Sequence, residues 1–557
     1  MRNISNKLPY VYLIIFSFFI ILDRYNLSEL INYNYHTWHT SYGASINQHL
    51  SGWYGYVNDK WSFPLTITNS INYPKSSSII LTDSLPIFAI FFKIFKTFLP
   101  ENFHYFGIWK IICILFLCIF SYNLSNKHLT NNNYLSLLFS IFCICSFPLF
   151  SREGNPTLNG HFLLILGFHL YFNLINEFNV SNFTKSFILL IISLHIHFYF
   201  FSLIFLFILS AFLQNYLDKK MTFKFFVKKV ILMVFLIISV GYITGFFYSF
   251  GGIGFDRFDN KGMPLLSLFF GSNEFNFQTI FNNQTNVMHH SEQYESLNYL
   301  GIGLILLIPI SLYLYFLNNK YFNKHIVLLT TFTLVFIYSL GSKIYITENL
   351  VFQYNHHKIP FMSFITGLLA VAGRLFIFNY IIIIFFCFKQ IISSNLNNRL
   401  IFMILTFVTI IQFYEIYLLN YSENKIKSNL DSILKNELFL EKNEYEFLIT
   451  KDDLINKIDI KDTVIIPPYV CEGSILSQKI YGYLLYNKKK VNSIWQGRDN
   501  FNCEEKKDQA NKMLSSENFR KFNYIFLNKN NDNYPSLTNI KNTLNCKIFE
   551  EITICKK

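Results

Sequence analysis

Long apolar runs alternate along the chain with short polar loops. A helix needs about 20 mostly apolar residues to cross a bilayer, and fewer where a helix bundle thins the bilayer locally. The pattern predicts eleven membrane-spanning helices, near residues 9–23, 106–124, 133–150, 159–177, 184–197, 198–214, 228–248, 298–317, 325–342, 375–394 and 400–419. We therefore expect a polytopic α-helical membrane protein, with a transmembrane domain over residues 1–419.

The run from 184 to 214 is long enough for one helix or for two short ones. A single helix would place the lysine-rich loop 219–229 outside the membrane, whereas Lys and Arg are enriched in cytoplasmic loops. A turn at His195–Tyr199 restores this rule. With that turn, the short basic loops all lie inside, and the C-terminal tail lies outside.

The first outer loop, residues 23–106, gathers polar and aromatic groups between apolar segments, among them His49, Trp53, Trp61 and Asp83. Such groups at a membrane surface favour a site for a sugar or a phosphate headgroup. The alternative is an ordinary solvated loop, although a loop of this length is uncommon unless it is functional or disordered. We predict that the loop forms one wall of a site on the outer side.

Two apolar segments are unsuited to crossing the bilayer. Residues 84–100 carry Lys93 and Lys96 within a short run, which predicts an amphipathic helix at the interface with its lysines snorkelling to headgroups. Residues 361–373 are too few to span and predict a second interfacial or re-entrant helix.

From about Asn420 the chain becomes charged and mixed, with β-rich runs at 463–469, 481–486, 523–528 and 546–555 and a helical stretch at 504–514. This alternation predicts a small extracytoplasmic α/β domain over residues 420–557. Four of the nine cysteines fall in it: Cys471, Cys503, Cys546 and Cys555. An even number in one oxidising compartment predicts two disulfides, with three pairings open.

Composition agrees with a membrane protein, since only 15% of residues are charged against about 25% in soluble proteins. The net charge of +13 is explained by lysines in cytoplasmic loops rather than by nucleic-acid binding. The N-terminal apolar run lacks a small-residue cleavage site and reads as a retained signal anchor. The pairs His289–His290 and His356–His357 lack metal-ligand spacing, so we assign no metal ligands. The cofactor is unknown, and a divalent metal ion is the only cofactor that we consider.

Several outer segments carry candidate binding residues. A phosphate favours positive and hydrogen-bonding groups, and the guanidinium of arginine matches it with a planar fork. Trp rings stack on sugars, although aromatic belts also place Trp at interfaces. Arg374 is alternatively a snorkelling anchor, and His195 and His197 are alternatively hydrogen-bonded structural residues. The substrate-binding candidates are His49, Trp53, Trp61, Lys93, Arg152, His161, His197 and Arg374.

Several stretches carry a resemblance: WSFPL (61–65), NYPKSSSIILTDSLP (72–86), REGNPTLNGH (152–161), YESLNYLGIGLILL (294–307), GRLFIFNY (373–380) and VNSIWQGR (491–498). Together they resemble a family of bacterial multi-pass membrane proteins that is similar to GT-C glycosyltransferases. The resemblance implies a GT-C-like fold in the bacterial inner (cytoplasmic) membrane. It also implies transfer of a sugar from a polyprenyl-linked donor to a glycan or lipid acceptor at the cell surface. A surface-polysaccharide polymerase and a non-catalytic or transport protein that binds lipid-linked glycans are the alternatives.

Such a transfer needs a carboxylate to accept the proton of the attacking hydroxyl. GT-C enzymes usually keep this acid early in the first outer loop, and in SINQHLSGW (45–53) the matching position is Ser45. Asp83 is the best remaining carboxylate and is our catalytic candidate. Because it directly precedes the predicted helix 84–100, it is alternatively the N-cap of that helix. Asp23 and Asp59 are weaker candidates.

Overall fold

The computed structural model describes residues 8–25, 27–31, 33, 44–71, 73, 76–150, 152, 155–248, 258–270, 296–318, 325–347, 349–415, 463–465, 482, 484–486, 488–491, 524–528, 545–549 and 552–556. The chain forms two compact units. The helical unit comprises Met1–Ile31, Phe106–Ile237 and Phe255–Ile433. The loop–tail unit comprises Asn32–Tyr105, Ile238–Gly254 and Leu434–Lys557, so most of the first outer loop groups with the tail.

Helices occupy each of the apolar runs. Their bounds are α2 (Leu8–Arg24), α3 (Leu27–Leu30), α7 (Phe106–His128), α8 (Asn133–Ile144), α9 (Phe147–Phe150), α10 (His161–Asn176), α11 (Val180–Leu194), α12 (Phe198–Leu217), α13 (Phe223–Thr244), α14 (Ile302–Asn318), α15 (Ile326–Ser339), α16 (Met362–Leu368) and α17 (Ile377–Ile392). A further helix covers Asn398–Glu415.

Among the described residues, six helices are long and apolar enough to cross a membrane. They are Phe106–His128, Pro156–Asn176, Phe198–Leu217, Phe223–Thr244, Ala372–Ile392 and Asn398–Glu415. Five shorter apolar helices of 10–17 residues coincide with the other predicted spans: Leu8–Asp23, Asn133–Ile144, Val180–Leu194, Ile302–Leu317 and Ile326–Ser339. The protein is thus a mostly helical membrane protein.

The predicted break in the run 184–214 is confirmed, because α11 ends at Leu194 and α12 begins at Phe198. Two histidines cap the helices at this break. His195 Nδ1 donates to the carbonyl of Ile191 at 2.8 Å, and His197 Nδ1 accepts from the backbone N–H of Tyr199 at 3.2 Å. Their side chains therefore satisfy backbone groups that a helix end leaves open.

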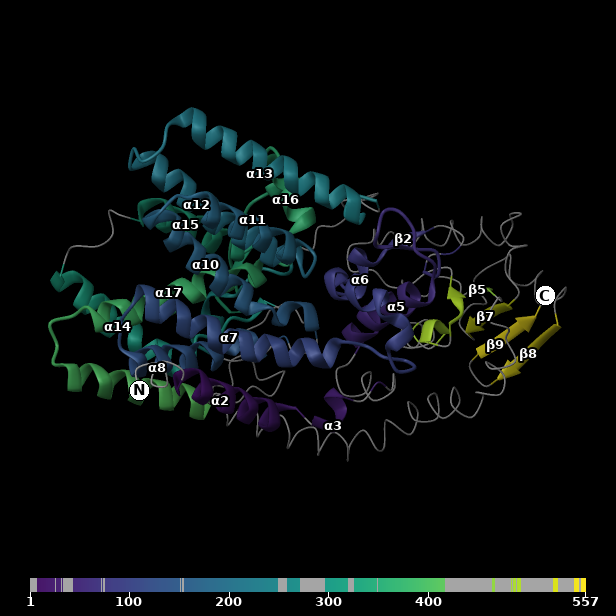
Figure 1. Ribbon diagram of the computed structural model, residues 1–557, viewed down its shortest axis with the longest axis horizontal. Helices are drawn as coiled ribbons and strands as arrows, with labels where there is room; N and C mark the ends of the chain where they lie inside the picture. Colours follow the sequence, from purple (N-terminus) through teal and green to yellow (C-terminus); the bar gives the residue numbers. More distant parts are fainter. Residues whose placement is uncertain are drawn as a thin grey trace. The chain divides into compact units, whose positions relative to one another are not determined.

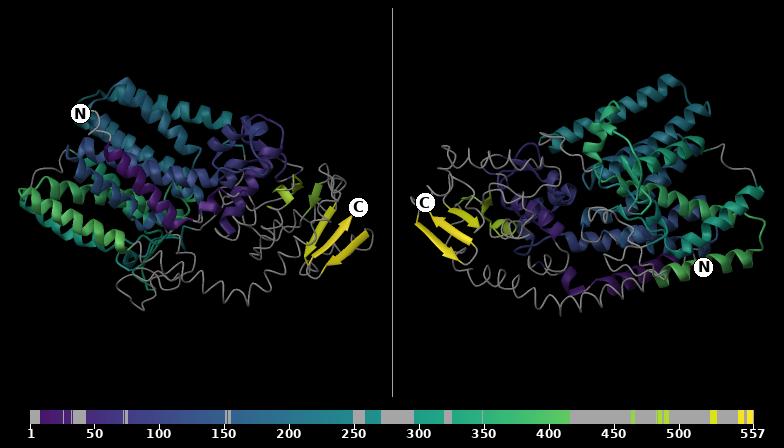
Figure 2. Two further views of the ribbon diagram at one scale, coloured as in Figure 1. Left: turned by 60° about the horizontal axis from the view of Figure 1, so that its bottom comes forward. Right: turned by 180° about the vertical axis from the view of Figure 1, so that it is seen from behind.

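Helices α7, α10, α12 and α17 pack side by side at the centre of the helical unit (Figures 1 and 2). Aromatic rings fill the space between them. Phe207 of α12 stacks on Phe378 of α17 with ring centroids 4.3 Å apart, and Phe168 of α10 contacts both Phe207 and Phe385 at 5.0 Å. The Phe excess of the sequence is thus used for interhelical packing.

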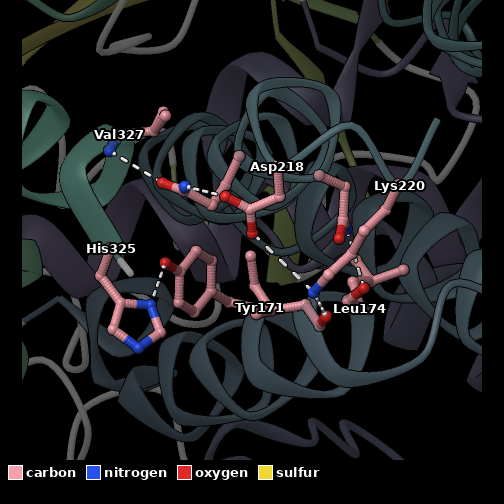
Figure 3. A network of polar contacts seen from close by, with 9 residues as sticks. Tyr171, Leu174, Asp218, Lys220, His325 and Val327 are labelled. Carbon is pink, nitrogen blue, oxygen red and sulfur yellow. Dashed lines mark hydrogen bonds and ion pairs between the residues drawn. The ribbon is translucent and has the colours of Figure 1, made fainter. Parts of the chain in front are cut away.

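A polar network joins α10, α12 and α15 at the lysine-bearing end of α12 (Figure 3). Gln214 accepts from the N–H of Val327 at 3.2 Å and donates to Asp218 at 2.9 Å. The Tyr171 hydroxyl lies 2.8 Å from His325 Nδ1. Because Val327 lies in the first turn of α15, the network supplies an acceptor that the helix itself lacks there.

In the loop–tail unit, the described part of the first outer loop folds into α5 (Ala44–Asn58), a β1 (Ile67–Thr68) and β2 (Ser77–Ser78) pair, η1 (Ile79–Thr82), α6 (Pro86–Ile94) and η2 (Lys96–Phe98). The segment 84–100, which the sequence predicts to be an interfacial helix, is thus helical over most of its length. In the helical unit, β3 (Lys343–Tyr345) and β4 (Leu350–Gln353) form an antiparallel hairpin, and η3 (Pro156–Asn159), η4 (Leu265–Leu268), η8 (His356–Lys358) and η9 (Ala372–Phe376) are single turns.

The tail contributes a mixed five-stranded sheet in the order β6-β5-β7-β9-β8, and its C-terminal strands are the yellow arrows of Figure 2. Its strands are β5 (Thr463–Ile465), β6 (Lys490–Val491), β7 (Tyr524–Asn528), β8 (Asn545–Phe549) and β9 (Ile552–Lys556). β5 runs parallel to β6 and β7, whereas β9 runs antiparallel to β7 and β8.

The predicted strand at 481–486 is wrong, because the described residues there are helical. Adjacent Leu484 and Leu485 are both buried, whereas a half-buried strand would bury alternate residues. A short apolar run does not by itself distinguish a strand from a buried helical turn.

Candidate functional site

Four basic side chains from separate segments of the helical unit, together with the backbone of Lys261, are linked through shared neighbours, and we call this set the basic cluster. Its members are Arg152, His161, His197, Lys261 and Arg374, and all except the half-buried Arg374 are buried. Four of these five were predicted from the sequence as phosphate or substrate contacts. The structure brings those four together from the turns before α10, α12 and α17.

Arg152 is linked to Arg374 through one asparagine. Arg152 Nη2 donates to Asn298 Oδ1 at 3.1 Å, and Asn298 Nδ2 donates to the carbonyl of Gly373 at 2.8 Å. Arg152 also interacts electrostatically with His161. Asn298 therefore joins the Arg152 guanidinium to the backbone of Gly373, the residue before Arg374.

Lys261 joins the same place through its backbone. Its carbonyl accepts from the Gly373 N–H at 3.1 Å and from Ser296 Oγ at 2.6 Å. A Cβ atom at Gly373 would overlap the side chain of Ser296, so this close approach requires glycine. Sequence reasoning missed Lys261 and Asn298, and only the glycine of the GRLFIFNY stretch marks the contact.

Arg374 stacks on an aromatic ring that is itself fixed. Its guanidinium carbon lies 5.6 Å from the ring centroid of Tyr199, whose hydroxyl accepts from the Val371 N–H at 2.7 Å. His161 and His197 both contact the ring of Phe200, at 6.0 and 6.4 Å. The guanidinium thus lies beside an anchored ring, and its planar shape suits recognition of a phosphate.

Asp83, the catalytic candidate, lies in the loop–tail unit with its carboxylate partly exposed. Gln48 Nε2 donates to Asp83 Oδ2 at 3.5 Å, and His49 Nδ1 donates to the Asp83 carbonyl at 2.7 Å. Asp83 and Leu85 both adopt left-handed backbone conformations, with φ of 52° and 49°. Such conformations cost roughly 1–3 kcal/mol each and cluster at functional sites.

The alternative prediction, that Asp83 caps the following helix, is wrong. The N-cap of α6 is Leu85, without a side-chain cap bond, and Asp83 instead follows η1 as its C-cap. The carboxylate is held by a side chain of α5 and not by the backbone of α6. Asp59 is a turn residue, since it accepts from Thr68 Oγ1 at 2.9 Å and from the N–H of Asn69.

Two of the predicted substrate-binding residues, Trp53 and His49, lie in the core of the loop–tail unit. Trp53 is buried, its Nε1 donates to the carbonyl of Phe103 at 2.6 Å, and its ring meets Tyr105 at 5.0 Å. His49 is also buried. These residues position the loop, whereas the ring of Trp61 is half exposed and accessible to a ligand.

Lys93 does not snorkel, and the prediction for this residue is wrong. Its ammonium lies 3.8 Å from the ring centroid of Tyr56 and 4.8 Å from that of Trp61, and it donates to the Lys60 carbonyl at 3.3 Å. Burial lowers the pKa of Lys93 to about 8. The exposed side chains of the segment from α6 to η2 are the apolar Phe91, Ile94, Phe95 and Phe98, together with Lys96 and Thr97.

Two acidic residues that sequence reasoning missed are fixed in the helical unit. Glu415 is buried and accepts from the Tyr299 hydroxyl at 2.6 Å and from the Ile302 N–H at 2.7 Å. Asp259 lies 3.3 Å from His356 Nδ1 and accepts from Ser342 Oγ. In the sequence, Glu415 stands out as a single acidic residue at the end of an apolar run, and this is the signal that would have identified it.

Some predicted residues lie outside the described part of the chain. These are Cys471, Cys503, His289, His290 and the side chains of Ser45, Cys546 and Cys555. Within the described residues, no group of three or more His, Cys, Asp or Glu side chains is arranged to hold a metal ion.

Comparison with known proteins gives a family. No curated protein matches the chain. Residues 13–417, more than half of the chain, match the family described as Domain of unknown function (DUF6311). The match covers the predicted spans and the basic cluster together. The chain therefore belongs to the DUF6311 family.

Proposed function

We propose that the protein is a membrane glycosyltransferase that moves a sugar from a polyprenyl-linked donor to a glycan or lipid acceptor outside the membrane. The observation that carries this proposal is the basic cluster. Guanidinium groups are matched to phosphate oxygens, and the cluster offers two of them, from Arg152 and Arg374. A polyprenyl phosphate carries such oxygens, and its long apolar chain keeps it in the membrane.

In this proposal the acceptor hydroxyl loses its proton to the Asp83 carboxylate while its oxygen attacks C1 of the sugar. The bond between C1 and the phosphate oxygen breaks, and the lipid phosphate leaves with the electron pair. In the helical unit, Arg152 and Arg374 bind the phosphate of the donor.

The test compares two aspartates of the first outer loop. Asp83→Asn removes the base, and a general base contributes about 10²–10⁴-fold in rate. Asp59→Asn is the matched control, because Asp59 only closes a turn. Sugar transfer from a labelled polyprenyl-phosphate donor in proteoliposomes should fall by that factor for Asp83→Asn only. Full activity of Asp83→Asn would remove the catalytic assignment.

Arg374 tests the donor site separately. Arg374→Gln should weaken donor binding strongly. Arg374→Lys should weaken it less if charge alone matters, and equally if the planar fork is required. Binding of the labelled donor to protein in nanodiscs measures both. Unchanged binding by Arg374→Gln would argue against a phosphate in the basic cluster.

The second candidate function is a non-catalytic or transport protein that binds lipid-linked glycans. Ser45 at the position of the usual acid favours it. Under this alternative Arg374→Gln would still lose donor binding, whereas Asp83→Asn would change neither binding nor turnover. A surface-polysaccharide polymerase differs by extending a chain, so product length identifies it.

We place the protein in a bacterial inner membrane with eleven crossings and an outer tail.

A further inference from the structure

The segment between α15 and η9 exposes large apolar side chains on the β3–β4 hairpin, on η8 and on α16. All four residues of β4 are exposed, although alternate residues of a strand point to opposite faces. We call these side chains the 346–365 surface: Ile346, Leu350, Val351, Phe352, Ile359, Phe361, Phe364 and Ile365.

Two features show that this exposure is built into the fold. Soluble proteins rarely leave a contiguous apolar surface of this kind uncovered, and an isolated two-stranded hairpin is marginal in water. Phe361 is 84% exposed and holds a left-handed backbone with φ of 61°. That conformation is unfavourable for a bulky residue, and here it presents the ring outward at the start of α16.

The surroundings of the surface indicate what covers it. The segment is attached to α15, because the Tyr338 hydroxyl donates to the Leu369 carbonyl at 3.2 Å. On the same helix, Leu334 and Ile337 are exposed apolar residues, 63% and 51% accessible, within a predicted span. The 346–365 surface is therefore attached to a helix whose own exposed side chains include apolar ones.

Cationic groups accompany the apolar ones. His357 and Lys358 are exposed on η8, and Lys343 begins β3. An apolar surface with a cationic rim fits the boundary between acyl chains and anionic headgroups.

We propose that the 346–365 surface inserts into the membrane interface, with lipid acyl chains as its occupant. Its consequence concerns the basic cluster, because Arg374 lies in η9, which begins at Ala372, shortly after α16 ends at Leu368. The inserted segment holds Arg374 at the depth of lipid headgroups, where a lipid-linked phosphate lies. The proposal stands without any assumption about the group that is transferred.

Photo-crosslinking in nanodiscs tests the insertion. Benzoylphenylalanine replaces Phe352 or Phe361, with Phe235 on the outside of α13 as the lipid-facing control and exposed Lys488 of the loop–tail unit as the aqueous control. We expect lipid adducts by mass spectrometry at 352, 361 and 235 and none at 488. Crosslinks from 352 and 361 to a second copy of the chain, or no lipid adducts there, would overturn the proposal.

A second readout needs only a conservative change. Phe361→Trp keeps an aromatic ring at the position, so folding should be retained. The fluorescence added relative to wild type should be quenched by brominated lipids and protected from iodide. Quenching by iodide instead would show that the ring lies in water and would contradict the proposal.

Discussion

Lys93 illustrates how burial and charge act at a single residue. Its folded-state pKa of about 8 lies below the unfolded value of about 10.4. Between these values the unfolded chain binds the proton and the folded chain does not, so stability rises as pH rises through this window. Below pH 8 the folded state carries the full cost of burying the charge.

We therefore expect Lys93→Met to remove this pH dependence. The unfolding midpoint of the wild-type protein minus that of Lys93→Met should increase from pH 8 to pH 10.4. Lys60→Met, at an exposed neighbouring lysine, is the control and should keep the wild-type profile. Equal profiles for wild type and Lys93→Met would contradict the cost assigned to burial.

Glu415 accepts two hydrogen bonds, from the Tyr299 hydroxyl and from the Ile302 N–H. Glu415→Ala should leave the Tyr299 O–H and the Ile302 N–H without this acceptor, at about 1–3 kcal/mol for each buried donor. Tyr299→Phe removes one bond and should cost only about 0.5–1.5 kcal/mol. Denaturant unfolding in detergent micelles measures both. If Glu415→Ala is no less stable than Tyr299→Phe, the carboxylate does not hold the start of α14.

At the scale of elements, the pairing of β8 with β9 reduces the three disulfide pairings. The antiparallel register places Cys546 directly opposite Cys555. Opposite residues in such a pair have Cα atoms about 4.5–5.5 Å apart, within the range of about 4.4–6.8 Å that a disulfide spans. The register therefore favours Cys546–Cys555, which leaves Cys471 with Cys503.

Non-reducing peptide mapping should find the Cys546–Cys555 crosslink. In Cys546→Ser, thiol alkylation should label Cys555 alone among the tail cysteines, and stability should fall by about 2–5 kcal/mol as is typical for a lost disulfide. Labelling of all four cysteines in the wild-type protein would exclude both bonds.

At the scale of the whole molecule, the sidedness of the chain follows from its basic loops. Because Lys and Arg are retained in the cytoplasm, the loop at Lys219–Lys229 should lie inside and the tail outside. An alkaline phosphatase fusion at Lys557 should be active, and one at Lys220 inactive. The reverse pattern would rule out the eleven-crossing topology.

The sequence by itself determined where the apolar helices of the helical unit lie, and even the break between α11 and α12, but it did not predict α5. Lipid offers no partners to backbone groups, so an apolar run in a membrane has little choice but to form a helix. It also identified Arg152, His161, His197 and Arg374, because charged and polar residues stand out against an apolar chain. Apolar runs and the charged residues within them can be recognised from the local sequence alone, without the tertiary contacts.

Only the tertiary structure decided which of these residues meet. Asn298 joins Arg152 to Gly373, and Tyr56 with Trp61 encloses Lys93. Such contacts depend on which segments pack together, and residues far apart in sequence carry no record of that in their spacing. For the same reason, the sequence did not predict that Lys93 of α6 is buried. Lipid fixes that a segment is helical, whereas packing fixes which of its faces is buried.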